Sequence, residues 1–555
     1  MRTLTLASLA LAATTQLAAQ TTATPAAPAP HIVVDTVGPD GWRMRFGPTN
    51  LGSLLESEQG RAMWQPGAMP ILETWQALVG DEAKFAEAKA RLLGHAGRVR
   101  LAVWLDAGRI EQQPLKMAAL LVDGDGRTDL AALAADIAHL QGRTPGEWHD
   151  QEIGGAKHRV RAYRDEQMTA ATVVDGRVAV FYASADDLGA AVAAGTAFAG
   201  PLAAAKPVAP TTPALQIHVD VPALMAMALA AGDKEDNAFL QALGLAELGK
   251  AKFVLGTAGP HVQFGFEQEL PAQPRGFVAA FAPATTGVST LQRLVAADAA
   301  AWKVGHFDLG AAFEGVVDAI AAMDFRGGED GLRAEMKQEL GFDPSEALFP
   351  HLTDEVLFTG SSLRGLDRPE EFTWALGWRL KDEKAFVPNF QAMLAKGKPM
   401  LSREATVDVH GMELQRYGNM LGYDLWIATG NGLVLLGGGR DAEATLTAIA
   451  KTAATPAPAA EATPPTTAAF DGVRPHLPPG TTGLARGDLS SVLLMPTEWW
   501  ADLFWGMGLF PFRPVEKDQS ETSAAVQELL QQHNLSTVRT ATGRNGTTFH
   551  WRLYW

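Results

Sequence analysis

The chain has 555 residues and a formal net charge of −16, with 46 Lys and Arg residues against 62 Asp and Glu residues. At about 100 to 200 residues per domain, this length predicts three or four packed units, and a 47% hydrophobic share with 19% charged residues indicates a folded chain. The acidic balance and the absence of a Lys/Arg run argue against a nucleic-acid partner. The absence of cysteine excludes disulfides, thiolate metal ligands and cysteine nucleophiles.

Residues 1–19 are predicted to be a secretory signal peptide. Met1 and Arg2 give a positive start, an apolar run follows at residues 4–13, and Leu17-Ala-Ala19 forms a small-residue cleavage site. The Thr/Ala/Pro-rich residues 20–30 are interpreted as an extended tether. No later apolar run approaches the ~20 residues of a spanning helix. We therefore expect a mature bacterial protein without a transmembrane segment, in the periplasm or outside the cell.

An internal repeat is the strongest pattern in the chain. Asp175-Gly176 and Asn431-Gly432 each lie between two β-rich runs, and each pair supplies the positive φ angles of a tight two-residue hairpin turn. Asn431 follows Asp175 by 256 residues. The predicted hairpins span residues 171–182 and 425–436, and the helices that follow them span 187–194 and 441–451.

Other predicted elements recur at nearly the same spacing, which a chance match of two hairpins does not explain. The matching pairs are strands 116–122 and 372–380, helices 125–137 and 382–394, and strands 155–163 and 411–417. Residues 45–51 and 305–309 are each expected to end a strand with Asn or Asp before Leu, as an Asx turn or N-cap into a helix. Strand 251–256 is expected to pair with 261–266, and strand 537–542 with 547–553.

We therefore expect two homologous halves, each with a larger and a smaller α+β part. The expected parts are 31–200 and 214–272 in the first half, 273–452 and 480–555 in the second half, with a Pro/Ala-rich linker at 453–479. The alternation of helices with tight hairpins predicts the α+β class, internally duplicated, with mostly antiparallel sheets whose hairpins are covered by helices on one face. A doubly wound parallel sheet fits this pattern less well.

One distinctive stretch of the second half is residues 341–356, with the sequence GFDPSEALFPHLTDEV, followed by strands 374–380 and 411–417 and the Asn431-Gly432 hairpin. This order resembles a family of exported bacterial proteins that is catalogued only as a domain of unknown function. The resemblance covers residues 276–555 and, more weakly, the first half. It implies an α+β fold and an exported location, and it transfers no active site because it contains no diagnostic catalytic motif.

Two short segments partly match known ligand-binding motifs but lack features that those motifs require. Residues 437–442 match a Gly-x-Gly-x-x-Ala dinucleotide fingerprint, but their strand is the second arm of a tight hairpin and a Pro/Ala linker follows. Residues 123–129 suggest a calcium loop, but Arg127 stands at the fifth position, where an oxygen ligand is needed. The simpler interpretation of this loop is a turn in which Thr128 or Asp129 caps the next helix.

The histidines show no metal-site spacing. His149 and His158 lie on strands that turn back near Gly154-Gly155, and with no third ligand they are interpreted as two neighbouring surface histidines. We expect neither a metal nor a cofactor.

Residues 499–512 contain six aromatic side chains and form the most unusual stretch in the chain. On a helix, Trp500 and Phe504 share one face while Trp499 lies on another. Two interpretations stay open: core packing or contact between the halves, and a platform for a lipid, a glycan or the apolar surface of another protein. The candidate binding residues are Trp499, Trp500, Phe504 and Trp505.

The leading functional hypothesis is a noncatalytic exported protein whose duplicated α+β scaffold offers an interaction or ligand-binding surface, with an unknown envelope protein, lipid or glycan as partner. The alternative is a secreted hydrolase whose catalytic residues converge only in the folded protein. A deep pocket with two or more inward-facing titratable groups would favour the hydrolase.

Overall fold

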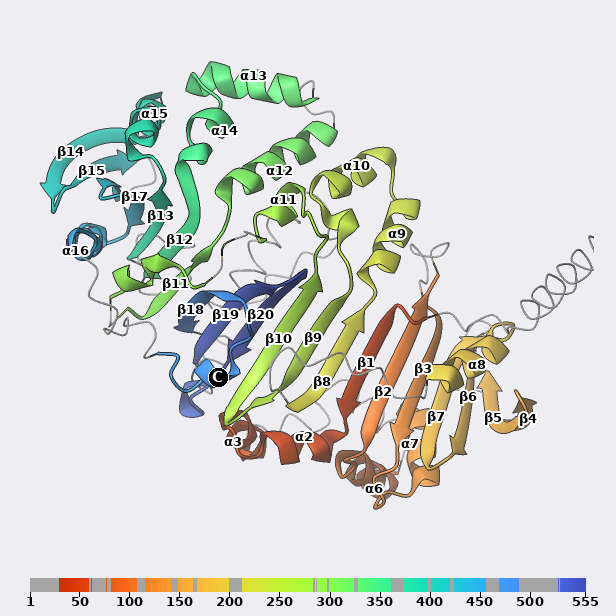
Figure 1. Ribbon diagram of the computed structural model, residues 1–555. Helices are drawn as coiled ribbons and strands as arrows, with labels where there is room; N and C mark the ends of the chain where they lie inside the picture. Colours follow the sequence, from red (N-terminus) through yellow and green to blue (C-terminus); the bar gives the residue numbers. More distant parts are fainter. Residues whose placement is uncertain are drawn as a thin grey trace, which may run out of the picture.

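The computed structural model describes most of the chain (Figure 1). The described residues are 29–58, 61, 76, 81–106, 115–140, 148–162, 167–198, 212–282, 285, 287–296, 299–323, 328–360, 373–396, 401–419, 424–455, 469–488, 528 and 530–555. Helices and antiparallel strands are both abundant, which confirms the α+β class.

Within the described residues, the strands form one antiparallel sheet of 20 strands. From one edge to the centre, the order is β4 (His149–Ile153), β5 (Ala156–Ala162), β6 (Gln167–Val174), β7 (Arg177–Ser184), β3 (Leu115–Asp123), β2 (Arg98–Leu105), β1 (Ile32–Val37), β8 (Thr212–Val219), β9 (Ala251–Ala258) and β10 (His261–Glu269). From the centre to the other edge, the order is β20 (Thr548–Tyr554), β19 (Thr537–Asn545), β18 (Thr481–Asp488), β11 (Ala301–His306), β12 (Leu352–Gly360), β13 (Trp374–Leu380), β17 (Leu433–Gly438), β16 (Asp424–Gly430), β15 (Met412–Asn419) and β14 (Leu401–Val409).

The first ten strands and the last ten follow the same spatial order, reversed about the centre of the sheet. β1 lies between β2 and β8, just as β11 lies between β12 and β18. Among the described strands, the two sets are hydrogen-bonded to each other only where β10 pairs with β20, from Gln263 opposite Tyr554 to Glu269 opposite Thr548. Figure 1 shows these two strands side by side in the middle of the sheet, with the two ends of the sheet on either side.

The hairpins predicted from sequence are confirmed. Asp175 and Gly176 have φ angles of 50° and 73°, and Asn431 and Gly432 have φ angles of 53° and 71°. All four lie in the left-handed region that a two-residue hairpin turn requires. The predicted pairing of the last strands is also confirmed, because β19 and β20 form a hairpin from Arg539 opposite Tyr554 to the turn.

The helices connect and flank these strands. In chain order they are α2 (Pro39–Phe46), α3 (Asn50–Glu56), α6 (Glu82–Leu93), α7 (Leu130–Leu140), α8 (Leu188–Phe198), α9 (Val221–Ala231), α10 (Lys234–Ala242), α11 (Gly276–Ala279), α12 (Leu309–Ala322), α13 (Gly328–Leu340), α14 (Pro344–Ala347), α15 (Glu383–Lys396) and α16 (Ala442–Ala454). Within the described residues, no helix combines the length and the apolar character that crossing a membrane would require.

Helices pack on both faces of the outer parts of the sheet, where coverage of one face was expected. In β3, Leu121 packs with Val192 of α8, whereas its neighbour Val122 packs with Leu133 of α7. Because neighbouring residues of a strand point to opposite faces, α7 and α8 lie on opposite faces. The second set of strands shows the same arrangement, since α16 packs beside Leu435 and α15 packs beside Val434.

The predicted strand end at residues 45–51 and the predicted end of the 453–479 linker both differ from the structure. Residues 45–51 do not end a strand, because Pro39 starts helix α2 and its fixed φ favours the first helical turn; the strand before this helix is β1. The predicted 453–479 linker also ends inside the core, where Phe470 and Val473 are buried. The matching expectation at 305–309 is confirmed, because Asp308 accepts a hydrogen bond from the amide of Ala311 at 3.0 Å and caps α12.

Candidate functional site

A cavity of about 410 Å³ lies between β1, β2, β8 and helix α2. Its volume falls in the ~300 to 1,000 Å³ range of small-molecule sites. Three side chains in the lining are charged, three more are polar, and three are apolar. The lining residues are Asp35, Thr36, Val37, Arg45, Arg98, Thr212, Pro213, Ala214 and Gln216.

The cavity opens where the strand pairing becomes irregular. The pairing of β1 with β8 ends at Thr36 opposite Leu215, and the register of β8 with β9 shifts between Pro213 and Leu215. At this bulge the carbonyl oxygen of Ala214 accepts a hydrogen bond from a side chain. The donor is the hydroxyl of Thr36, at 2.9 Å. Trp42 in turn donates its indole N–H to the Thr36 oxygen at 2.9 Å. These two hydrogen bonds fix the irregular ends of β1 and β8 beside the cavity.

An ion pair forms one wall of the cavity. Arg98 donates from Nε to Oδ1 of Asp35 at 2.6 Å, and its terminal amino group contacts the other carboxylate oxygen. This hydrogen bond raises the pKa of Arg98, against the opposing effect of burial. Asp35 is almost fully buried, and the adjacent guanidinium of Arg98 compensates its negative charge.

Arg45 adds a second cation to the cavity. Its guanidinium donates to the carbonyl oxygen of Pro213, which fixes the side chain across the opening between α2 and β8. A guanidinium carries five N–H donors, so this single bond leaves most of them for other acceptors. With Asp35 paired to Arg98, Arg45 gives the lining a net positive charge.

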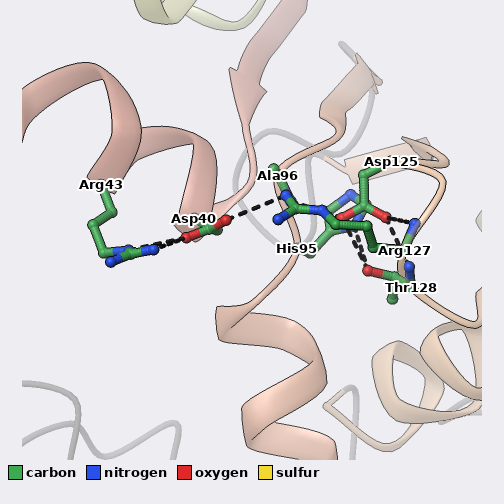
Figure 2. A network of polar contacts seen from close by, with 7 residues as sticks. All are labelled: Asp40, Arg43, His95, Ala96, Asp125, Arg127 and Thr128. Carbon is green, nitrogen blue, oxygen red and sulfur yellow. Dashed lines mark hydrogen bonds and ion pairs between the residues drawn. The ribbon is translucent and has the colours of Figure 1, made fainter.

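Helix α2 is fixed to the sheet by the polar network drawn in Figure 2. Asp40, in its first turn, accepts from Arg43 at 2.9 Å and from Arg127 at 3.2 Å. These two bonds lower the pKa of Asp40, with the bond from Arg43 as the largest cause. The amide of Asp40 also donates to the carbonyl of His95 at 3.0 Å. The start of α2, and with it the position of Arg45, is therefore held by the contacts of Asp40 to the loops that carry His95 and Arg127, whereas the bond from Arg43 lies within the helix.

The loop that resembles a calcium site is part of this network. Asp125 accepts hydrogen bonds from the amides of Ala96, Arg127 and Thr128 at 3.1, 2.9 and 2.8 Å, and these bonds lower its pKa despite burial, which alone would raise it. Figure 2 shows His95 beside it, with Nδ1 3.4 Å from the carboxylate. The bonded oxygens of Asp125 therefore hold the loop against Ala96, two residues before the start of β2.

The predicted helix cap after this loop is confirmed. Asp129 accepts from the amides of Ala131 and Ala132 at 2.9 and 3.3 Å at the start of α7. In the second half, residues 437–442 begin with the last two residues of β17, which pairs antiparallel with β13 and β16. A dinucleotide fingerprint requires a parallel βαβ unit, so this string is a turn from strand to helix.

The structure corrects the interpretation of His158. This histidine was expected at the surface beside His149, but it is buried and packs edge-on against Phe181, with ring centroids 5.9 Å apart. It lies on the inward face of β5, where it fills core volume, and burial lowers its pKa. Within the described residues, no group of three or more His, Asp or Glu side chains is arranged to hold a metal ion.

The aromatic binding residues predicted from sequence lie outside the described residues. These residues are Trp499, Trp500, Phe504 and Trp505. The cavity residues Asp35, Arg45 and Arg98 were not among the candidates, because no motif connects a strand, a helix and a second strand that meet only in the folded protein.

Comparison with known proteins gives no functional assignment. No family model matches the chain, and no curated protein matches it. Crystal forms III, IV and I of TP0453 are similar at 8%, 8% and 10% sequence identity, over 43%, 44% and 44% of this chain and 76%, 78% and 76% of that chain. Their TM-scores are 0.20, 0.21 and 0.19, which are too low to carry an argument.

Proposed function

We propose that the protein is an exported, noncatalytic binding protein whose cavity beside β1 and β8 holds a small polar ligand. The observation that carries this proposal is the cavity of about 410 Å³, in which six of the nine lining side chains are charged or polar and several are fixed by hydrogen bonds. Because Asp35 is neutralised by Arg98, the remaining cation is Arg45. One surplus guanidinium favours a ligand with a single carboxylate, which it can bind through two parallel hydrogen bonds.

The contacts inside the cavity support a binding role over the alternative of a secreted hydrolase. A hydrolase needs a nucleophile or an activated water beside a free base. Here the Thr36 hydroxyl donates to a backbone carbonyl, and the Asp35 carboxylate accepts from Arg98. Both groups are held by structural contacts, so the polar lining is suited to recognition.

The proposal includes an internal duplication of the scaffold. Its support is the strand order, which runs β4-β5-β6-β7-β3-β2-β1-β8-β9-β10 in one set and β14-β15-β16-β17-β13-β12-β11-β18-β19-β20 in the other. Two unrelated ten-strand sheets would not be expected to share this order. We also retain, as part of the proposal, membership of the family of exported bacterial proteins that the second half resembles.

The proposed location rests on residues 1–19, which have the pattern of a cleaved secretory signal. The chain expressed with its own amino terminus should be recovered in processed form from the periplasmic fraction or the medium. Membranes washed with carbonate should release it. Retention of the processed chain in washed membranes would contradict this part of the proposal.

The aromatic residues of 499–512 are proposed as a second, partner-binding surface. Trp499→Ala with Trp505→Ala should weaken binding to vesicles of phosphatidylethanolamine and phosphatidylglycerol, or to an envelope partner, while the melting temperature stays within about 2 °C. A large loss of thermal stability would instead assign these tryptophans to the core.

The cavity itself is tested with Arg45→Gln and a matched control, Arg43→Gln. Both arginines lie on α2, but Arg43 is exposed and pairs with Asp40 outside the cavity. The probes are acetate, lactate and glutamate, with acetamide as the neutral comparison. We expect at least one carboxylate to raise the melting temperature of the wild type and of Arg43→Gln, and to lose this effect in Arg45→Gln. Equal responses to acetamide, or equal losses in both variants, would overturn the proposed site.

A further inference from the structure

Two arginines face each other on neighbouring strands near the centre of the sheet. Arg486 of β18 lies directly opposite Arg539 of β19, so both side chains are on the same face. Residues directly opposite in an antiparallel pair have Cβ atoms about 5 Å apart, and like charges there destabilise the pair. This arrangement needs a compensating negative charge.

Within the described part of the chain, no carboxylate forms an ion pair with either arginine. Arg539 donates from Nε to the carbonyl of Ala469 at 2.6 Å, and its pKa is lowered by burial and by the charge of Arg486. Among the acids on this face, Asp488 lies two residues from Arg486 on β18, and Glu267 already binds Arg552. The local excess of positive charge contrasts with the net charge of −16 of the whole chain.

A further polar side chain lacks a partner on the same face. His550 lies on β20 in alternation with Arg552 and Tyr554, so the three share a face with Arg539. His550 is fully buried, and neither of its ring nitrogens has a hydrogen-bond partner among the described residues. Of these three, Arg552 binds Glu267 and Tyr554 donates to the carbonyl of His476, so His550 is the one that leaves a ring N–H unused on the described part of this face.

We propose that Arg486 and Arg539 bind a doubly charged oxyanion of the phosphate class. Two guanidinium groups can each give two parallel N–H donors to a tetrahedral oxyanion, and its two negative charges match their two positive charges. A single carboxylate would neutralise only one of them. The corresponding strands of the first half place His218 opposite Lys252, which lacks the guanidinium pair, so the site belongs to the second half alone.

This site is separate from the cavity, which is lined by β1, β2, β8 and α2, and the two proposals are tested by different variants. The test measures binding of inorganic phosphate by calorimetry and by melting temperature, with chloride at matched ionic strength as the reference. Arg486→Gln and Arg539→Gln are compared with Arg544→Gln. Arg544 lies on the same strand as Arg539 but on the opposite face, where it donates to the carbonyl of Gly546.

We expect phosphate to stabilise the wild type and Arg544→Gln. Arg486→Gln and Arg539→Gln should each weaken phosphate binding at least about tenfold, because each removes a charge-assisted pair of hydrogen bonds. Without phosphate, Arg486→Gln should melt no lower than the wild type, because the substitution removes the like-charge repulsion. A purely structural arginine would instead lower the melting temperature when replaced.

Any one of three results would overturn the proposal: a phosphate effect no larger than that of chloride, unchanged phosphate binding in Arg486→Gln, or equal weakening in Arg544→Gln. Glycerol 3-phosphate serves as a second probe. Binding of the ester at least as tight as that of phosphate assigns the site to a phosphorylated molecule, whereas binding of phosphate alone assigns it to the free ion.

Discussion

Glu267 of β10 and Arg552 of β20 form an ion pair across the strands that join the two sets of ten. Arg552 also donates to the carbonyl of Phe266 at 3.1 Å, and both side chains of the pair are almost fully buried. Gly265, directly opposite Arg552, leaves the room that the guanidinium occupies, because a Cβ there would lie 2.7 Å from Nη1. A buried ion pair between distant parts of the chain therefore links β10 and β20 at the centre of the sheet.

Arg552→Met should destabilise the protein by about 3 kcal/mol, because it leaves the buried carboxylate of Glu267 without its partner. Urea unfolding followed by tryptophan fluorescence measures this loss. The double variant Glu267→Leu with Arg552→Met should regain most of it, since no unpaired buried charge remains. Equal stability of the single variant and the wild type would show that the pair does not hold the junction together.

His550 should make the folded protein sensitive to acid. Burial, with a smaller effect of Arg552, lowers its pKa to about 4, whereas an unfolded histidine has a pKa of about 6.5. The unfolded chain therefore takes up this proton first as the pH falls. The stability that neutral His550 provides is complete above about pH 6.5 and is lost progressively toward pH 4, by an amount on the order of 3 kcal/mol.

The measurement is the free energy of unfolding at several pH values for the wild type and His550→Gln. The difference in slope between the two proteins reports on His550, because burial also lowers the pKa of His95, His158 and His218 in both of them. The variant should lose less stability than the wild type between pH 6.5 and pH 4. Parallel pH profiles would mean that His550 is accessible to protons in the folded state.

Local features of the fold could be predicted from the sequence because their physical causes are local. Asn431-Gly432 specifies a hairpin turn through its own backbone preferences, and the alternation of residues on each side specifies the strands. The pairing of β10 with β20 joins Phe264 to Leu553 and has no such local signal. A register between strands so far apart in sequence depends on the assembled sheet.

The cavity residues were likewise only partly predictable from local sequence. Asp35 is the one charged residue of β1, whose other residues are Ile, Val and Thr, and a charged residue inside such a strand was a usable signal for a buried partner. Its partner Arg98 stands among alternating residues of β2 and carries no such mark. Arg45 was assigned to the end of a strand, whereas it lies in α2, so its approach to Pro213 could not be foreseen.

Two glycines with equal free space should respond oppositely to substitution by alanine. A Cβ at Gly432 or at Gly189 would meet no atom within 4 Å, but Gly432 has a φ of 71° and Gly189 lies in helix α8 with an ordinary φ. Gly432→Ala should therefore lower the free energy of unfolding by about 1 kcal/mol through backbone strain. Gly189→Ala should raise it by about 0.5 to 1 kcal/mol. Denaturant unfolding of both variants checks the signs, and a shared sign would rule out backbone conformation as the cause.

Deletion of residues 549–555 should unfold the second half and uncouple it from the first. β20 is hydrogen-bonded on both sides, to β10 and to β19, so its removal breaks the only described strand pairing between the two sets and exposes two strand edges. It also removes Leu553 and Tyr554, which are fully buried. Limited proteolysis should then degrade the second half, while a fragment that contains β1 to β9 resists longer because its strand pairs do not involve β20. A truncated protein with the proteolytic pattern and melting temperature of the full chain would contradict the role assigned to β20 as the strand that joins the halves.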